Sequence, residues 1–181
     1  MNGDLLGRRV FIGIKAPGDI AATLASLREY FPDVPGRFVP PEDIHLTLVP
    51  PWQMEDQGMI EAKMHAALRG MEPFTIMLKL LSYGPSPDRP RLAWVSCEPS
   101  AELSRLKRSL AAAFPVQDHV PFVPHLTIAR FDERDRALLR RRPVEQRIDL
   151  PMPVSSVELF LSPHRGGRGY EVLASLSLPL E

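Results

Sequence analysis

The sequence predicts an α+β protein in which two related lobes enclose a central cleft. The first observation is a motif, His-x-Thr-x with aliphatic residues at x, that occurs at 45–48 and again at 125–128. The second is that other landmarks recur at nearly the same spacing. Leu81-Ser82 and Leu161-Ser162 are 80 residues apart, as are the two motif histidines, and Phe31-Pro32 precedes Phe114-Pro115 by 83 residues. The third is a pattern of strands and helices that repeats in one order.

A nearly constant offset between several landmarks indicates an internal duplication. We expect a single two-lobed domain over 1–181, with repeats at approximately 8–97 and 91–180. Each repeat would contain a strand, a helix, the His-x-Thr strand, a second helix and a hairpin. An approximate twofold axis between such repeats would bring the two His-x-Thr strands face to face in the cleft.

Local patterns predict each element of the first repeat in turn. The apolar run at 9–14 predicts a buried strand, and Pro17 begins an amphipathic helix that ends near Tyr30. The first motif strand follows, and Pro50-Pro51 is expected to end it because proline cannot donate to a ladder. We then expect a helix at 56–69 and strands at 73–83 and 91–97 around a turn at 84–90.

The second repeat shows the same order of elements. Leucines at 103, 106 and 110 predict a helix that ends at Phe114-Pro115. The second motif strand follows Pro124, and Asp132 is expected to cap a short Arg-rich helix that extends to about residue 142. Strands are predicted at 154–162 and 170–178, on either side of a Gly-rich turn.

Composition limits the classes of function. With 22 basic and 22 acidic residues in 181, the chain has no global positive field for gripping long nucleic acid, so such a substrate would be held locally, by its end. The lone Cys97 excludes an intrachain disulfide framework and is typical of a reducing compartment. Residues 1–9 lack the apolar core of a signal peptide, and no run approaches the roughly 20 apolar residues of a membrane span. We therefore expect a cytoplasmic monomer with no membrane partner.

Each motif alternates polar and apolar residues, which is the period of a half-buried strand. Its His and Thr then share one face, and its aliphatic residues share the other. A single copy of the motif is typical of a strand face that is exposed to solvent. Exposure to solvent requires polar residues but not the same motif twice, so the repetition indicates a function. Two imidazoles across a cleft can act as an acid and a base near neutral pH, and two Thr hydroxyls can donate to a tetrahedral anion. This set favours phosphoester chemistry, most economically the opening of a 2′,3′-cyclic phosphate.

Zinc binding is the competing use of the histidines. A catalytic zinc site needs three protein ligands, and threonine is not a usual one. His119 lies six residues before His125 and could be recruited, but no carboxylate accompanies either motif at ligand spacing. We therefore predict no metal and no cofactor.

The chain resembles the two-histidine phosphoesterase superfamily. Within it, the chain is most similar to the LigT-like RNA 2′,3′-cyclic phosphodiesterases, also called 2′-5′ RNA ligases. The similarity covers nearly the whole chain and is most specific around the second motif. It is carried by the two motifs and by residues 9–14 (RVFIGI), 122–130 (FVPHLTIAR) and 167–170 (GRGY).

The resemblance implies a bilobal LigT-like fold, with antiparallel sheet in each lobe, helices outside and both motifs in the cleft. It also implies metal-independent hydrolysis of 2′,3′-cyclic phosphate ends of RNA or oligonucleotides to 2′-phosphomonoesters. In the family the first-motif histidine is the proton donor and the second is the proton acceptor. His45 would then protonate the 3′ oxygen and His125 would activate water, while Thr47 and Thr127 contact the phosphate.

Three further residues are candidates for substrate binding, each with an alternative. Arg130 would contact phosphate if its strand ends or bulges, and would otherwise be a surface cation. Phe11 could stack on a base or belong to the core, and Tyr170 could reach the cleft or remain an ordinary strand residue. One departure from the family is residues 49–52 (VPPW), where many relatives have Phe-Leu-Gly after the first motif. This changes the rim of the cleft and hence the substrate preference.

Two other functions remain open from the sequence. The same fold could act on a cyclic or 2′-5′ linked phosphate of a small nucleotide. A non-catalytic nucleotide-binding module could use the cleft without turnover, although loss of a motif histidine would be expected in that case and neither is lost.

Overall fold

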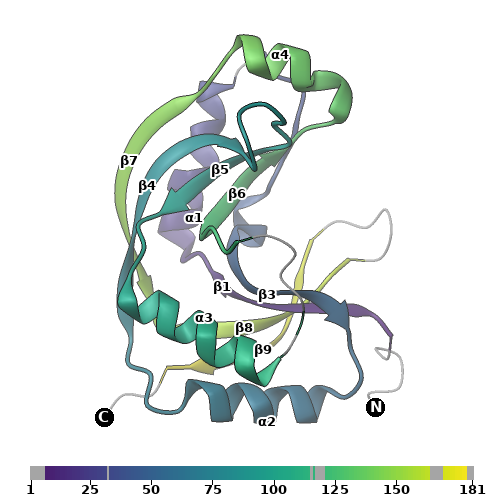
Figure 1. Cartoon of the computed structure of the whole chain (residues 1–181), viewed down its shortest axis with the longest axis vertical. Helices are drawn as coiled ribbons and strands as arrows, with labels where there is room; N and C mark the ends of the chain where they lie inside the picture. Colours follow the sequence, from purple (N-terminus) through teal and green to yellow (C-terminus); the bar gives the residue numbers. More distant parts are fainter. Residues whose placement is uncertain (1–6, 32, 115, 117–120, 164–168, 179–181) are drawn as a thin grey trace.

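The computed structural model describes residues 7–31, 33–114, 116, 121–163 and 169–178 (Figure 1). The strands are β1 (Arg9–Lys15), β2 (Arg37–Phe38), β3 (His45–Gln53), β4 (Phe74–Gly84), β5 (Leu92–Cys97), β6 (His125–Arg130), β7 (Glu145–Val154), β8 (Ser156–Leu161) and β9 (Glu171–Ser177). The helices are α1 (Gly18–Ser26), α2 (Gln57–Leu68), α3 (Ala101–Ala113) and α4 (Arg136–Arg141). Short 3-10 turns are η1 (Leu27–Tyr30), η2 (Pro41–Asp43) and η3 (Glu133–Asp135).

The strands form one antiparallel sheet in the order β7-β4-β5-β6-β3-β1-β8-β9, with β2 added beside β6. The two motif strands β3 and β6 are the central neighbours, and they pair at Leu46 and Leu126. Figure 1 shows β4, β5, β6 and β7 in its upper part and β1, β3, β8 and β9 in its lower part. This mixture of helices with antiparallel sheet confirms the predicted fold class.

Each half of the sheet takes strands from both ends of the chain. The half that contains the first motif strand, β3, includes β8 and β9 from the C-terminal part, and the half that contains β6 includes β4. Four strands lie on each side of the junction between β3 and β6, and each motif strand is the innermost strand of its half. A single domain of two lobes, with repeats at 8–97 and 91–180, is compatible with this symmetry, and its origin by duplication stays a proposal.

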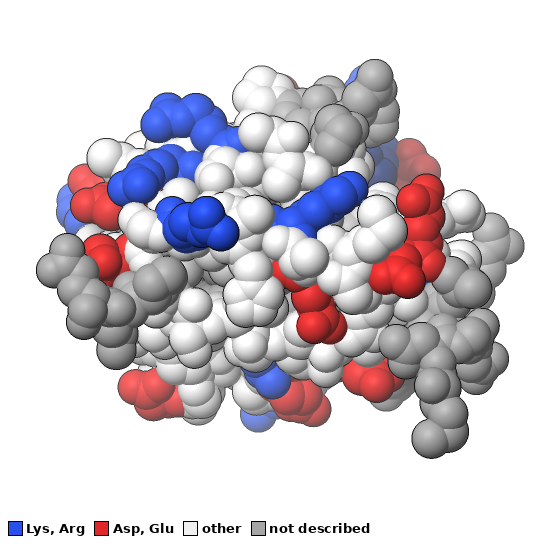
Figure 2. Space-filling model, turned by 90° about the horizontal axis from the view of Figure 1, so that it is seen from below, with Lys and Arg blue, Asp and Glu red and all other residues white. Residues whose placement is uncertain are grey.

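The helices begin at side-chain caps that the sequence already contains. The Asp56 carboxylate accepts from the Met59 amide of α2 at 2.8 Å, and the Ser100 hydroxyl accepts from the Leu103 amide of α3 at 3.0 Å. Asp132 forms a reciprocal capping box with Asp135 at the start of η3, which leads directly into α4, and this confirms the predicted cap. Helices α2 and α3 contact one another and together form one face of the molecule. Figure 2 shows this face, and the basic side chains gather toward one side of it.

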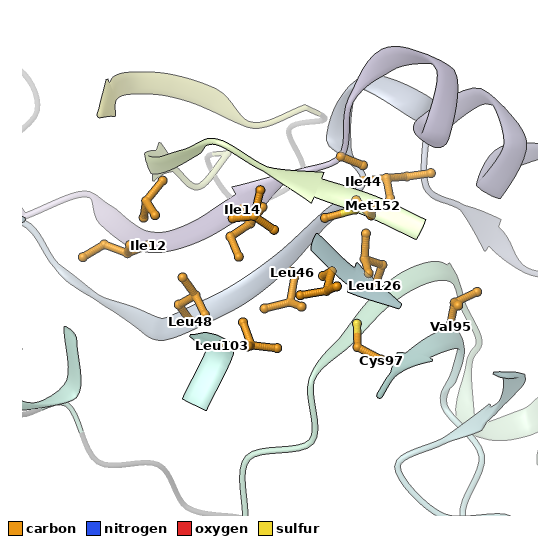
Figure 3. Close-up of a cluster of buried hydrophobic side chains, with 14 of the residues drawn as sticks. Ile12, Ile14, Ile44, Leu46, Leu48, Val95, Cys97, Leu103, Leu126 and Met152 are labelled. Carbon is orange, nitrogen blue, oxygen red and sulfur yellow. The ribbon is translucent and has the colours of Figure 1, made fainter. Parts of the chain in front are cut away.

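The core determines which face of the motif strands is left for chemistry. Leu46 and Leu126 are both fully buried and lie among the aliphatic side chains of neighbouring strands (Figure 3). Burying one leucine stabilises the fold by about 1.5–3 kcal/mol. A slip of either strand by one residue would therefore expose leucines and bury histidine and threonine instead. Packing of the apolar face thus holds the polar face of both motifs toward the cleft.

Two details differ from the prediction. Strand β3 does not end at Pro50-Pro51 but continues to Gln53, which pairs with Arg9 of β1. The prolines are tolerated because β3 pairs with β6 only at Leu46, so its outer part is an edge where no amide is needed. Strand β7 was not predicted. It is an edge strand on β4, and Pro151 and Pro153 within it mask its strand pattern.

Candidate active site

The pairing of the two motif strands places four polar side chains in a square. Because Leu46 lies opposite Leu126, His45 lies opposite Thr127 and Thr47 lies opposite His125, on the face away from the leucines. Directly opposed Cβ atoms in such a pair are about 4.5–5.5 Å apart, and diagonal ones about 7–8 Å. This confirms the prediction that the two motif strands are neighbours. The histidines occupy one diagonal of the square, and all four side chains are half-buried.

Both imidazoles are oriented by the same local hydrogen bond. Nδ1 of His45 lies 2.6 Å from the carbonyl oxygen of Asp43, and Nδ1 of His125 lies 2.7 Å from the carbonyl oxygen of Val123. A carbonyl oxygen only accepts, so Nδ1 of each ring carries a hydrogen. This leaves Nε2 of each ring as the nitrogen that can take or give a proton. The arrangement holds both rings ready for acid–base chemistry.

Burial is the main influence on the protonation of both histidines. Desolvation lowers the pKa of His45, and the positive charges of Arg130 and His125 lower it further. The hydrogen bond to the Asp43 carbonyl and the Asp43 charge act in the opposite direction. Burial likewise lowers the pKa of His125, and Arg130 adds to the effect. Neutral imidazoles are thus favoured, and an anion between them would raise both pKa values.

His45 is enclosed by aromatic rings. Its centroid lies 4.8 Å from that of Phe11, 5.3 Å from Phe160 and 5.0 Å from Tyr170. The Asp43 carboxylate accepts from the Tyr170 amide at 2.9 Å, so it fixes Tyr170 beside the histidine. Phe11 is 2% exposed and stacks on Phe160, which places it beneath His45 and within the core.

His125 has a different environment. Trp94 is its aromatic neighbour, with ring centroids 4.2 Å apart, and the indole Nε1 donates to the Ser82 hydroxyl at 3.2 Å. A cavity of about 750 Å³ opens on this side. Thr47, His125 and Trp94 line it, whereas His45 does not. His125 of the second motif and Thr47 of the first therefore face a space large enough for a nucleotide.

A β-bulge turns Arg130 into the cleft. On β6, Thr127 pairs with Trp94 and Ala129 pairs with Ala93, so Ile128 is the extra residue between consecutive partners. The bulge reverses the alternation, and Arg130 lines the cavity instead of facing away from it. Its effect on the pKa of both histidines shows that its charge acts on the centre of the site.

The first motif strand carries the same bulge with a different outcome. On β3, Thr47 pairs with Gly13 and Val49 pairs with Ile12, so Leu48 is the extra residue. The residue that reaches the cavity after this bulge is Pro50. The Leu48 carbonyl accepts from the Lys107 amine of α3 at 2.7 Å, which places a cation at the cavity wall.

The structure brings together all seven residues that the sequence selected: His45, Thr47, His125, Thr127, Arg130, Phe11 and Tyr170. Sequence reasoning missed Asp43 and Lys107 as parts of the site. No periodic signal marks Asp43, and Lys107 lies on the polar side of its helix like any solvated lysine. His119, Gly167 and Arg168 lie outside the described residues.

The described side chains that could ligate a metal do not form a metal site. In the described part of the chain, no group of three or more His, Cys, Asp or Glu side chains could hold a metal ion. Cys97 is buried, and burial raises the pKa of its thiol to about 12, which is unfavourable for a nucleophilic thiolate. No described helix is long and apolar enough to cross a membrane.

Comparison with known proteins identifies relatives of the chain. A family model described as the 2′-5′ RNA ligase superfamily matches residues 16–165. An RNA 2′,3′-cyclic phosphodiesterase of Methanothermobacter thermautotrophicus is 34% identical over 103 residues, which cover 54% of this chain and only 56% of that protein. A protein of the same description from Aquifex aeolicus is 28% identical over 142 residues, which cover 72% of this chain and 74% of that protein.

Solved structures show the same fold. A crystal structure of a Thermus thermophilus protein superimposes with a TM-score of 0.77 at 25% identity and covers 94% of this chain and 97% of its own. Escherichia coli LigT, in a crystal structure with 3′-AMP, gives a TM-score of 0.68 at 24% identity, with 96% of this chain and 99% of that chain covered.

Proposed function

The chain belongs to the 2′-5′ RNA ligase superfamily, and on that premise we propose that it is a phosphoric diester hydrolase that opens 2′,3′-cyclic phosphates at RNA or oligonucleotide ends. The product is the 2′-phosphomonoester. Two relatives described as RNA 2′,3′-cyclic phosphodiesterases support this activity. The observation that carries it is the square of His45, Thr127, Thr47 and His125, in which Nε2 of both histidines is left for proton transfer.

The reaction requires two proton transfers and stabilisation of one anion. His125 accepts a proton from water through Nε2 while the water oxygen bonds to phosphorus. The bond from phosphorus to the 3′ oxygen breaks, and His45 donates its Nε2 proton to that oxygen. The phosphate stays on the 2′ oxygen. Bound phosphate raises the pKa of the imidazoles, which lets the pair hold the single proton that the acid needs.

The remaining groups bind the phosphate and hold the histidines. The hydroxyls of Thr47 and Thr127 donate to the non-bridging oxygens, and Arg130 supplies a positive charge that the bulge directs into the cleft. Tyr170 covers His45 and contacts the nucleoside. Phe11 supports the ring of His45 from below, since its buried position leaves little surface for stacking on a base.

The proposed reaction uses no metal and no cofactor, because general acid, general base and anion donors are all side chains of this chain. A cytoplasmic location and a monomeric state stay predictions from the sequence.

The direct test is an assay of purified protein in EDTA with a nucleoside 2′,3′-cyclic phosphate and with a short RNA that carries the same end. We expect turnover of both to the 2′-phosphomonoester, at a rate that dialysis against EDTA leaves unchanged. His125→Ala serves as the blank for contaminating phosphodiesterase. Loss of activity in EDTA with recovery on adding zinc would contradict the mechanism. Binding of both compounds without turnover would leave a nucleotide-binding module.

A further inference from the structure

Three arginines gather at one end of the cleft, beyond the histidines. Arg37 of β2 pairs with Arg130 of β6, and on the other side of β6 Arg130 pairs with Leu92, the neighbour of Arg91. All three arginines line the 750 Å³ cavity and are exposed to solvent. Arg37 in β2, Arg130 in β6 and Arg91 just before β5 thus lie at one level of the sheet.

Acids in the described part of the chain do not neutralise the charges of these arginines. Among the residues that the structure describes, no carboxylate oxygen lies within 4.0 Å of the guanidinium of Arg37, Arg91 or Arg130. Like charges directly opposite across a strand pair repel one another. The chain contains as many acidic as basic residues, so the segregation of three cations here is not a result of composition. A cation cluster that lines a cavity is typical of a site for an anion with more than one phosphate.

The backbone holds the two outer arginines in place. The Arg91 amide donates to the Gly84 carbonyl, and the Arg91 carbonyl accepts from the Phe131 amide, each at 2.8 Å. Strand β2 lies so close to β6 that a Cβ atom on Gly36 would come within 2.6 Å of the Phe131 ring. The backbone of Arg37 and of Arg91 is therefore a fixed part of the cavity wall, and both residues line the cavity.

Three cations that lie side by side can bind two neighbouring phosphates of one strand. Arg130 acts on both histidines, so its charge lies closest to the scissile phosphate. Arg37 and Arg91 flank it from the neighbouring strands. In an RNA that ends in a 2′,3′-cyclic phosphate, the next phosphate is one ribose away, on the 5′ side of the terminal nucleotide. We infer that Arg37 and Arg91 form a second phosphate subsite that binds this 5′ phosphate, so that oligonucleotide ends are preferred over cyclic mononucleosides.

This inference rests on the proposed function, and it is tested with compounds that differ only in the second phosphate. We compare adenosine 2′,3′-cyclic phosphate, the same compound with a 5′-phosphate, and a dinucleotide with the cyclic end. For the protein with its native sequence we expect kcat/KM to be roughly tenfold higher for the two compounds that carry a second phosphate. In the double variant Arg37→Ala/Arg91→Ala this ratio should fall close to one.

The matched control removes two charges elsewhere. Arg89→Ala/Arg108→Ala changes exposed arginines that do not line the cavity, and it should retain the roughly tenfold ratio. Far-UV circular dichroism and thermal unfolding identify any variant that fails to fold. The salt dependence supplies a second readout. The kcat/KM of the two compounds with a second phosphate should fall more steeply with added salt than that of the cyclic mononucleoside, and this difference should vanish in Arg37→Ala/Arg91→Ala.

Equal kcat/KM for all three compounds would overturn the inference, as would a double variant that loses the same factor on each of them. The second result would mean that these arginines serve the scissile phosphate only. If none of the compounds is hydrolysed, the proposed function fails, and the subsite is tested by binding alone. Calorimetry with adenosine 2′-phosphate and adenosine 2′,5′-bisphosphate should show roughly tenfold tighter binding of the bisphosphate, lost in the double variant. Equal dissociation constants would contradict the subsite.

Discussion

The two motif strands, β3 and β6, are alike within the His-x-Thr-x motif and differ in the residues that follow the motif and pair with it. In each strand Nδ1 of the histidine bonds the carbonyl oxygen of the residue two positions earlier. Each threonine lies opposite the histidine of the other strand. Each strand bulges at the fourth residue of the motif, at Leu48 or at Ile128.

The differences lie in the flanks. After the bulge, β6 directs Arg130 into the cavity, whereas β3 directs Pro50 there. The residue paired with Thr127 is Trp94, whereas the residue paired with Thr47 is Gly13, where a Cβ atom would come within 2.6 Å of the Leu46 carbonyl. Equivalent motifs therefore supply equivalent groups, and their neighbours place aromatic rings around His45 and an open cavity with Arg130 beside His125.

The largest expected effect comes from removing one histidine at a time. His45→Ala and His125→Ala should each lower kcat by at least roughly a hundredfold, because each removes one proton transfer. The double variant should lose much less than the product of the two single losses, since the residues act as a unit. The profile of kcat/KM against pH should be bell-shaped, with limbs that belong to the coupled pair.

A substrate with an activated leaving group separates the two roles. Such a leaving oxygen needs little protonation, so this substrate should largely restore turnover in His45→Ala and leave His125→Ala impaired. Restoration of the His125 variant instead would reverse the acid and base. Near-normal turnover of the ordinary substrate in both variants would exclude catalysis by the pair.

Arg130 is the charge that distinguishes the two strands, and Arg130→Ala should lower kcat/KM by roughly 10- to 100-fold through loss of a charged contact with phosphate. Its positive charge lowers the pKa of both histidines, so its removal raises both. Both limbs of the profile of kcat/KM against pH should then move to higher pH. Arg130→Lys keeps the charge, so it should keep the position of the profile while losing part of kcat/KM. A profile that stays in place in Arg130→Ala would place the guanidinium away from the histidines.

The threonines test whether the square is symmetric. Thr47→Ala and Thr127→Ala should each lower kcat by roughly tenfold, less than a histidine variant, since one phosphate donor is lost and proton transfer remains. Thr→Ser at either position retains the hydroxyl and is the matched control. Losses that differ by much more than tenfold between Thr47 and Thr127 would mean that only one of them contacts the phosphate.

The smallest effect is expected at Asp43, which acts only through its neighbours. Its charge raises the pKa of His45, so Asp43→Asn should lower that pKa and move the alkaline limb of the kcat/KM profile to lower pH. Asp43→Ala also removes the acceptor for the Tyr170 amide and should cost a further factor of roughly two to ten in kcat/KM. If the alkaline limb moves equally in Asp43→Asn and Asp43→Ala and both variants have the same kcat/KM, the hydrogen bond from the Tyr170 amide to Asp43 does not contribute to the reaction.

Much of the site was predictable because its signals are local. The alternation in 45–48 and 125–128 places His and Thr on one face of a strand, whatever the rest of the chain does. Prolines, caps and leucine spacing predict most of the helices and strands in the same way. Pro50-Pro51 and strand β7 were the failures, because the tolerance of proline depends on whether a strand lies at an edge, which sequence patterns do not record.

The sequence by itself thus determined the two motif strands and their polar face, and it selected the histidines and threonines that we propose as acid, base and phosphate donors. Only the tertiary structure decided what surrounds them. The bulge at Ile128 that aims Arg130 into the cleft depends on pairing with β5, and the bond between Asp43 and the Tyr170 amide joins residues 127 positions apart. Such contacts are chosen by packing among strands that are distant along the chain, and strand periodicity extends over only a few residues.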